Sequence, residues 1–275
     1  MKKVDIPRDE RVRVLSLGAG VQSSTLAMLY QNEVLKPIPH FAIFADTQTE
    51  PKAVYEYLEF LKKKVTRFPI YTVTEGCLHE DVLSGSRFAS PPFFIKHPNG
   101  KRGMGRRQCT GDYKIKVIQK GVRDLLGYKK GTWFRHKVDM IIGISVDEIQ
   151  RMKRSITKWI ENRYPLIEDM DWKRSDCKDY FSEQGLPTPP RSACWMCPYR
   201  NDDEWIDLKK NHPHEFKMAV EFDREIRRLP KFHNENYLHI SLKPLGEVVF
   251  KPKGTPNQLG LMSYMQNECE GMCGL

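Results

Sequence analysis

Long hydrophobic runs are absent from this 275-residue sequence. None approaches the roughly 20 consecutive apolar residues that a membrane-spanning helix needs. The N-terminal stretch MKKVDIPRDERVRVL also lacks an apolar segment followed by small residues, which a secretory signal requires. We therefore expect a cytoplasmic protein with no membrane partner. The length is sufficient for one large domain, or for a domain with an appended subdomain, around a substantial core.

The sequence also lacks the even number of cysteines that a disulfide scaffold uses. Its seven cysteines are unevenly spaced, at positions 77, 109, 177, 194, 197, 269 and 273. In a cytoplasmic protein such a set indicates metal or redox chemistry rather than structural disulfides.

Acidic residues are scarce in one part of the chain. Residues 87–120 contain nine Lys or Arg residues and one acidic residue, and the whole chain carries a formal net charge of +10. Glycines separate the basic residues within 96–107, which predicts a mobile basic loop rather than a helix. Such a loop suits a polyanion, either the phosphates of a nucleotide or a nucleic acid.

The first half of the chain alternates short β-branched runs with helical patterns. We expect strands at 12–18, 40–46, 68–74 and 138–145, and helices at 23–34, 53–65 and 113–127. This order predicts an α/β fold, in which helices flank a parallel sheet in a Rossmann-like arrangement. We expect a nucleotide-binding domain over 1–160, with a basic loop at 84–112. A helical, cysteine-containing region over 161–275 would complete the site.

The segment SLGAGVQSST follows the first expected strand. It lacks the lysine of a Walker A loop and the third glycine of a G-x-G-x-x-G loop. Its glycines allow close approach to an anion, and its serines and the next helix offer hydroxyl and N–H donors. The candidate phosphate-binding residues are Ser16, Gly18, Gly20, Ser23 and Ser24. In the alternative, Ser23 or Ser24 only caps the helix, and the loop sequence alone does not decide between the two.

Two further polar clusters follow expected strands. DTQTE, at 46–50, comes after the second strand, and SVDEIQRMKR, at 145–154, comes after the strand that ends at Ile144. The carboxyl ends of parallel strands meet at one edge of a sheet, where ligands bind in this fold class. The three clusters are therefore expected to line one ligand site.

The ordered set of segments resembles the PP-loop adenine nucleotide α-hydrolase superfamily, and within it the phosphoadenosine phosphosulfate (PAPS) reductase family. The matching segments after the loop are FADTQTEP (44–51), QCTGDYKIKVI (108–118), GISVDEIQRMK (143–153) and YPLIEDMDWKRSDCKDYFSEQGLPTP (164–189). Together the matches span residues 12–198. The chain departs from the family pattern at two places, because Val21 or Gln22 stands near an expected Asp and Ser145 replaces an expected Arg.

The resemblance implies that the protein binds an adenine nucleotide, which is ATP, PAPS or the unphosphorylated analogue APS. It implies that Asp46 and Thr47 lie close to the ribose or to a metal such as Mg²⁺, and that Gly143 belongs to the nucleotide site. The side chains expected to neutralise phosphate or sulfate charge are Lys114, Lys116 and Arg151. The simpler alternatives are a loop-capping role for Asp46 and solvent exposure for the two lysines.

The segment CWMCP contains Cys194 and Cys197, which have the spacing with which two thiolates grip one metal ion. Cys109 precedes Cys194 by 85 positions, a separation that resembles the iron–sulfur members of the family. The resemblance implies a [4Fe–4S] cluster on Cys109, Cys194, Cys197 and a tail cysteine, for which we assign Cys269. Zinc on the same thiolates, or a thiol pair without metal, are the alternatives.

The tail NECEGMCGL resembles the C-terminal Glu-Cys-Gly segment of PAPS reductases, in which a cysteine takes sulfite from the substrate. It implies that Cys273 is the nucleophile, with Asp46 and Lys114 as the other catalytic candidates and thioredoxin or glutaredoxin as the reductant. Met272 stands where the family has glutamate. A tail with incidental cysteines is the alternative.

Three functions follow as expectations. The first is a PAPS-reductase-like oxidoreductase with cysteine-dependent sulfur chemistry. The second is an ATP-dependent sulfurtransferase of the same fold that thiolates a nucleic acid, which the basic loop at 96–107 would bind. The third is a non-catalytic, zinc-stapled module that holds nucleotide or nucleic acid without turnover.

Overall fold

The main sheet of the protein has five strands. The computed structural model describes residues 3–86, 91–230, 232 and 234–252. The strands are β1 (Val12–Leu17), β2 (Phe41–Asp46), β3 (Ile70–Thr74), β6 (Val138–Ile142) and β7 (Ile160–Arg163), in the order β3-β2-β1-β6-β7. Every pair within this sheet is parallel. The expected α/β class with a parallel sheet is therefore confirmed.

The strand order changes direction between β1 and β6. The chain moves outward from β1 through β2 to β3, and later from β6 to β7 on the other side. Such a switch point opens a crevice at the carboxyl ends of the two central strands, where ligands bind in doubly wound sheets. The loops that follow β1 and β6 both lie at this crevice.

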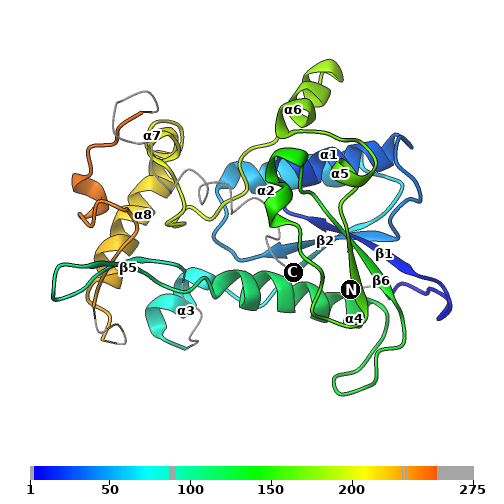
Figure 1. Cartoon of the computed structure of the whole chain (residues 1–275), viewed down its shortest axis with the longest axis horizontal. Coiled ribbons are helices and arrows are strands. Elements are labelled where there is room, and N and C mark those ends of the chain that lie inside the picture. The colour runs from blue at the N-terminus through cyan, green and yellow to red at the C-terminus, as the bar shows by residue number, and fades with distance from the viewer. Residues whose placement is uncertain (1–2, 87–90, 231, 233, 253–275) are drawn as a thin grey trace.

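The structure has helices on both faces of the main sheet and others beside it (Figure 1). They are α1 (Val21–Gln31), α2 (Lys52–Lys64), α3 (Leu78–Ser84), α4 (Lys116–Leu125), α5 (Pro165–Glu168), α6 (Arg174–Glu183), α7 (Asp202–Asn211) and α8 (Pro213–Ile226). Short 3-10 helices, η2 (Val146–Arg151) and η3 (Leu245–Glu247), and one π-helical turn, η1 (Gly111–Ile115), complete the set. No helix of the described residues is long and apolar enough to cross a membrane.

Alternation along the strands divides the core into two layers. Leu15 and Leu17 pack with α1, α2 and α6, whereas Val12 and Val14 pack with α4 on the other face. Successive side chains of a strand point to opposite faces, so a strand covered on both sides must be apolar throughout. Helix α1 is buried from Val21 to Tyr30 because α6 packs against it on the side away from the sheet.

A second core lies beside the sheet. It joins α3, α7, α8 and the segment around Trp195, and its largest fully buried side chain is Trp205. A three-stranded antiparallel sheet borders it, in the order β5-β4-β8, with β4 at Phe94–Lys96, β5 at Arg102–Met104 and β8 at Glu235–Tyr237. In Figure 1 this part occupies the left half of the molecule.

The basic stretch at 96–107, which we expected to be a loop, forms a β-hairpin up to Met104, and its mobility stays a prediction. β4 and β5 pair from Phe94–Met104 to Lys96–Arg102, and β4 also pairs with β8. Asn99 and Gly100 form the tip, where Gly100 adopts a φ of +76° that a residue with a side chain rarely adopts. The hairpin then leads through Arg107 to Cys109.

Candidate functional site

The loop between β1 and α1 carries the candidate phosphate-binding residues, and we refer to it as the phosphate loop for that reason. It presents backbone donors at the carboxyl edge of the sheet. The N-cap of α1 is Gly20, and the first bond inside the helix runs from the Ser24 N–H to the Gly20 carbonyl at 3.0 Å. Gly20 has no side chain, so the alternative in which a serine caps this helix is wrong. The N–H groups of the first helical turn have no acceptor within the helix, and the positive end of the helix dipole lies with them.

The serines of the loop have different roles. Ser23 Oγ accepts a hydrogen bond from the Gly18 N–H at 3.1 Å, so this side chain holds the loop in shape. The hydroxyls of Ser16 and Ser24 are buried and have no hydrogen-bond partner among the described residues. Leaving a buried hydroxyl unpaired is costly. A phosphate held at this helix N-terminus would supply the missing acceptors.

Gly143, directly after β6, forms one wall of the same loop. A Cβ atom placed on Gly143 would lie 2.7 Å from the Ser23 nitrogen and 2.9 Å from the Gln22 carbonyl carbon. Both are backbone atoms that cannot move aside, so only glycine fits. The GIS segment and the phosphate loop are thus packed backbone to backbone, as the expected convergence of the two motifs requires.

Gln22 and Ser145, which depart from the sequence pattern of PAPS reductases, are in contact with each other. The Gln22 side-chain amide donates to Ser145 Oγ at 3.3 Å and to Glu148 Oε2 at 3.0 Å, and its carbonyl accepts from Arg174 at 3.3 Å. Glu148 also pairs with Arg151 at 2.6 Å, and both side chains are buried. Burial raises the pKa of Glu148, while Arg151 opposes this shift. Arg151 is therefore already held by a carboxylate beside the loop.

The loop after β2 carries Asp46 and Thr47. Asp46 Oδ1 accepts hydrogen bonds from the Gln48 N–H at 2.7 Å and from the Tyr55 hydroxyl at 2.8 Å. Burial, and then the hydrogen bond to Asp46, raise the pKa of Tyr55. Thr47 Oγ1 lies 2.8 Å from Thr49 Oγ1 and 3.5 Å from the Cys194 sulfur. Asp46 thus shapes its own loop, and Thr47 reaches the cysteines.

The segment 192–197 crosses the carboxyl edge and connects these loops. Ser192 lies against the phosphate loop, because a Cβ on Gly20 would be 3.3 Å from the Ser192 Cβ. Two residues later, Cys194 contacts Thr47, and the Trp195 N–H donates to the Thr49 carbonyl at 2.9 Å. The Ser192 hydroxyl is also buried without a hydrogen-bond partner among the described residues.

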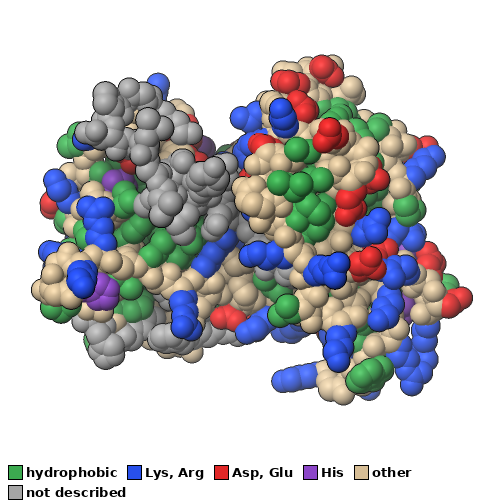
Figure 2. Space-filling model, in the orientation of Figure 1, with side chains coloured by type: hydrophobic (Ala, Val, Ile, Leu, Met, Phe, Trp, Pro, Cys, Tyr) green, Lys and Arg blue, Asp and Glu red, His purple; other side chains and the backbone are tan. Residues whose placement is uncertain are grey.

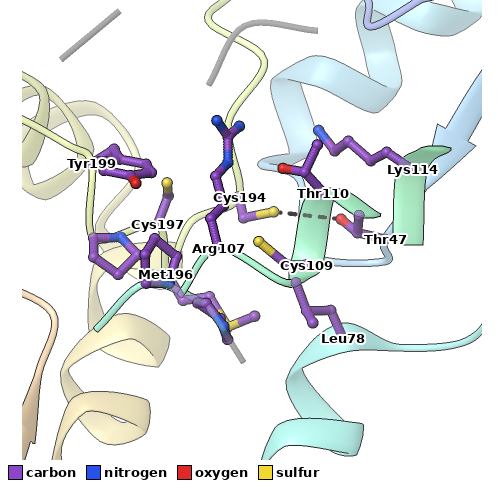
Figure 3. Close-up of a pocket in the computed structure, with 13 residues that line it drawn as sticks. Thr47, Leu78, Arg107, Cys109, Thr110, Lys114, Cys194, Met196, Cys197 and Tyr199 are labelled. Carbon is purple, nitrogen blue, oxygen red and sulfur yellow. Dashed lines mark hydrogen bonds between the residues drawn. The ribbon is translucent and has the colours of Figure 1, made fainter. Parts of the chain in front are cut away.

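Three of the predicted metal-binding cysteines line one pocket, which we call the cysteine pocket (Figure 3). Cys109 comes from the segment before η1, whereas Cys194 and Cys197 come from the turn before α7. The other lining residues are Thr47, Leu78, Pro91, Pro92, Arg107, Thr110, Lys114, Met196, Pro198 and Tyr199. Figure 3 shows the Cys109 and Cys194 sulfurs facing each other across the pocket, with the Cys197 sulfur farther away.

Charged groups border the cysteine pocket. Lys114 lies on the π-helical turn η1, a geometry frequent at functional sites, and its Nζ is 3.4 Å from a Glu50 carboxylate oxygen. The guanidinium of Arg107 lies over the ring of Tyr199 at 5.4 Å. Lys116, by contrast, pairs with Asp112 and its side chain is 73% exposed, so it lies in solvent.

The Cys194 thiol is neutral at physiological pH. Burial first, and then the Glu50 carboxylate, raise its pKa to about 12, while Lys114 and the two threonine hydroxyls act in the opposite direction. A neutral thiol is a poor nucleophile, and metal coordination deprotonates it. Cys177 also has a pKa raised to about 12 by burial, and it lies in the core, away from any site.

The donor chemistry of the pocket fits a cluster or zinc only in part. Three thiols line one cavity, and thiolate is the ligand type that both groups take. Among the residues described here, however, no three His, Cys, Asp or Glu side chains are close enough to hold one ion. Cys269 and Cys273, the predicted fourth ligand and nucleophile, lie outside the described residues.

The sequence did not single out Ser192, Arg107 or Tyr199. Arg107 and Ser192 each precede a predicted cysteine ligand by two residues. This closeness to the cysteines is the one sequence feature that could have indicated their part in the site. Comparison with known proteins adds no further residues: no protein-family model and no curated protein matches this chain.

Proposed function

We propose that this protein is an enzyme that binds an adenine nucleotide at the loop 16–24 and carries out cysteine-dependent sulfur chemistry in the cysteine pocket. The observation that carries the proposal is the path of segment 192–197, which touches the phosphate loop at Gly20 and enters the cysteine pocket at Cys194. A nucleotide whose phosphates lie on the loop would therefore have the thiols beside it.

In this proposal the chain's own groups divide the work. The N–H groups of the first turn of α1 and the hydroxyls of Ser16, Ser24 and Ser192 bind phosphate oxygens. Lys114 stabilises negative charge on the sulfate or the leaving phosphate, because its ammonium lies on the pocket wall. Thr47 lies between the nucleotide-binding part of the site and the cysteine pocket.

The concrete reaction is reductive cleavage of PAPS or APS. A cysteine thiolate, for which Cys273 is the candidate, attacks the sulfate sulfur and displaces the nucleotide phosphate oxygen. The products are a cysteine S-sulfonate and the adenosine phosphate. A thioredoxin or glutaredoxin dithiol then attacks the cysteine sulfur of this S–S bond, so that sulfite leaves with the electron pair and the dithiol is oxidised to a disulfide.

Cys109, Cys194, Cys197 and Cys269 would hold a metal centre in this proposal. A bound iron–sulfur cluster or zinc ion would keep these thiols deprotonated and add positive charge near the substrate. Without such a group the Cys194 thiol stays neutral, because burial raises its pKa.

A second function is favoured by the hairpin β4–β5. Its basic strand β5 leads directly into the pocket wall at Arg107 and Cys109, so a bound nucleic acid could reach the thiols. In this case ATP would adenylate a base oxygen with release of pyrophosphate. A cysteine persulfide, loaded by a sulfur donor, would then displace AMP through its outer sulfur. A second cysteine thiol would attack the inner sulfur of the resulting S–S bond, which leaves a thiolated base and a cysteine disulfide.

Anaerobic purification, followed by assays of iron, sulfide, zinc and turnover on the same sample, tests these functions. Sulfite release from PAPS or APS with a dithiol, lost in Cys194→Ser, is expected for the first function. Release of AMP that requires both ATP and nucleic acid would contradict the first function and support the second. A colourless zinc protein that binds nucleotide without turnover would contradict both and leave the binding module.

A further inference from the structure

A second basic surface lies at the opposite edge of the main sheet. The loop between α4 and β6 and the turn before β7 meet at the amino ends of the strands, where Val138 N–H donates to the Trp159 carbonyl at 2.8 Å. A six-residue strand such as β1 is about 20 Å long. This surface is therefore separated from the cysteine pocket by the length of the sheet.

Alternating burial gives the loop an inner and an outer side. Phe134 and His136 are 9% and 5% exposed, whereas Trp133, Arg135 and Lys137 between and beside them are exposed. Phe134 is fixed by the ring of Trp159, whose centroid is 4.3 Å away. The three outward side chains are consequently about 6.6 Å apart along an extended, well-anchored segment.

The exposed side chains combine one large aromatic ring with many cations. Trp133 is 85% exposed, which is unusual for the side chain with the most apolar area to bury. The exposed cations around it are Lys129, Lys130, Arg135, Lys137 and Lys158. We call Trp133 together with these five residues the Trp133 surface. Figure 2 shows Lys and Arg side chains gathered at the lower right, where Figure 1 draws the loops that lead into β6 and β7.

The cations of the Trp133 surface are not neutralised within the described part of the chain. No carboxylate there forms an ion pair with any of them, although neighbouring Arg11 is paired with Asp139 and Glu161. Shallow grooves run on both sides of Trp133. One is lined by residues including Lys137 and Lys158, and the other by residues including Arg8 and Lys129.

We propose that the Trp133 surface binds single-stranded nucleic acid, with Trp133 stacked on a base and Arg135, Lys137 and Lys158 on successive phosphates. The charge excess matches a polyanion, and an exposed indole beside cations matches the stacking platforms that bind unpaired bases. This inference is independent of the nucleotide site, because the two surfaces share no residue.

The test is fluorescence anisotropy of the full chain with a labelled mixed-sequence 20-nucleotide DNA or RNA strand, titrated at several salt concentrations. The triple variant R135A/K137A/K158A is expected to bind at least tenfold more weakly. It should also show a salt slope smaller by about 2, since each single-strand phosphate contact contributes about 0.7. Trp133→Ala should weaken binding about 5- to 150-fold, and Trp133→Phe should restore much of it.

The matched control K63A/K178A/K217A removes the same charge from exposed positions of α2, α6 and α8, outside both surfaces. Loss of binding in this control with normal binding in the first triple variant would overturn the proposal. The proposal would also be overturned if Trp133→Ala and the first triple variant both bound the labelled strand with the affinity of the wild type. So would binding to phosphatidylserine vesicles without binding to either strand, because the surface would then contact a membrane. Circular dichroism should show that these exposed substitutions leave the fold intact.

Discussion

Cys194 is the residue on which the chemistry of the site depends most. Its sulfur lies between the Thr47 hydroxyl and the pocket, close enough to Glu50 and Lys114 for both charges to act on it. Burial and Glu50 hold the thiol neutral, and Lys114 acts against them. A substrate anion or a metal that changes this balance would therefore change the reactivity of the thiol directly.

Replacing Glu50 should make Cys194 more reactive. Glu50→Gln removes a negative charge that raises the thiol pKa and leaves Lys114, which lowers it, so the pKa falls. The thiolate fraction below that pKa then rises tenfold for each unit of the fall. Iodoacetamide labelling of Cys194 at pH 9, followed by mass spectrometry, should be faster in this variant than in the wild type.

Two further variants test the opposite effect and serve as a control. Lys114→Met should slow the labelling of Cys194, because it removes the charge that favours the thiolate. Glu56→Gln removes an exposed carboxylate of α2 that pairs only with Lys52 among the described groups, and it should leave the rate unchanged. Equal rates in all four proteins would show that burial alone controls this thiol.

Residues of the site differ in how far the sequence could identify them. Ser16, Gly18, Gly20 and the cysteines follow from motif and spacing, since their neighbours along the chain carry the signal. Ser192 and Arg107 do not, because each joins the site through contacts with residues far away in the sequence. The Gln22–Ser145 contact was equally hidden, although both positions had been singled out separately.

At the scale of elements, the close contact between β6 and α1 fixes the phosphate loop. Gly143→Ala should destabilise the protein by about 1–3 kcal/mol, because its Cβ would lie 2.7 Å from a backbone nitrogen that cannot yield without moving the helix. Urea unfolding followed by circular dichroism measures this difference.

Gly111→Ala is the matched control for that substitution. No atom lies within 4 Å of a Cβ at Gly111, so this variant should be as stable as the wild type or up to about 1 kcal/mol more stable. A free energy of unfolding for Gly143→Ala within about 0.5 kcal/mol of the wild type would contradict the described packing of the loop.

The elements themselves were largely predictable. The strands of the central sheet are apolar and the helices between them are amphipathic or apolar, so periodicity identified them. β7 was missed because IENR, at the sheet edge, is mostly polar and lacks the apolar run of a buried strand. The hairpin at 94–104 was expected to be a loop because its strands, FIK and RGM, have only three residues each, too few to show an alternating pattern.

At the scale of the whole molecule, the two edges of one sheet carry different chemistry. The carboxyl edge holds the phosphate loop and the cysteine pocket. There Lys114 is paired with Glu50, and burial raises the pKa of the Cys194 thiol. The amino edge carries the exposed Trp133 surface, which accounts for part of the net charge of +10. A nucleotide and a polymeric anion could therefore bind to the same chain without competing.

In the proposed function, an adenine nucleotide binds beside the pocket thiols. The most direct measurement is mass-spectrometric labelling of each cysteine with and without saturating PAPS, APS or ATP. We expect at least one nucleotide to slow the labelling of Cys109 and Cys194, while Cys77, outside the pocket lining, reacts at an unchanged rate. If calorimetry shows nucleotide binding and the pocket cysteines still react at their original rates, the nucleotide binds elsewhere and the proposed function is contradicted.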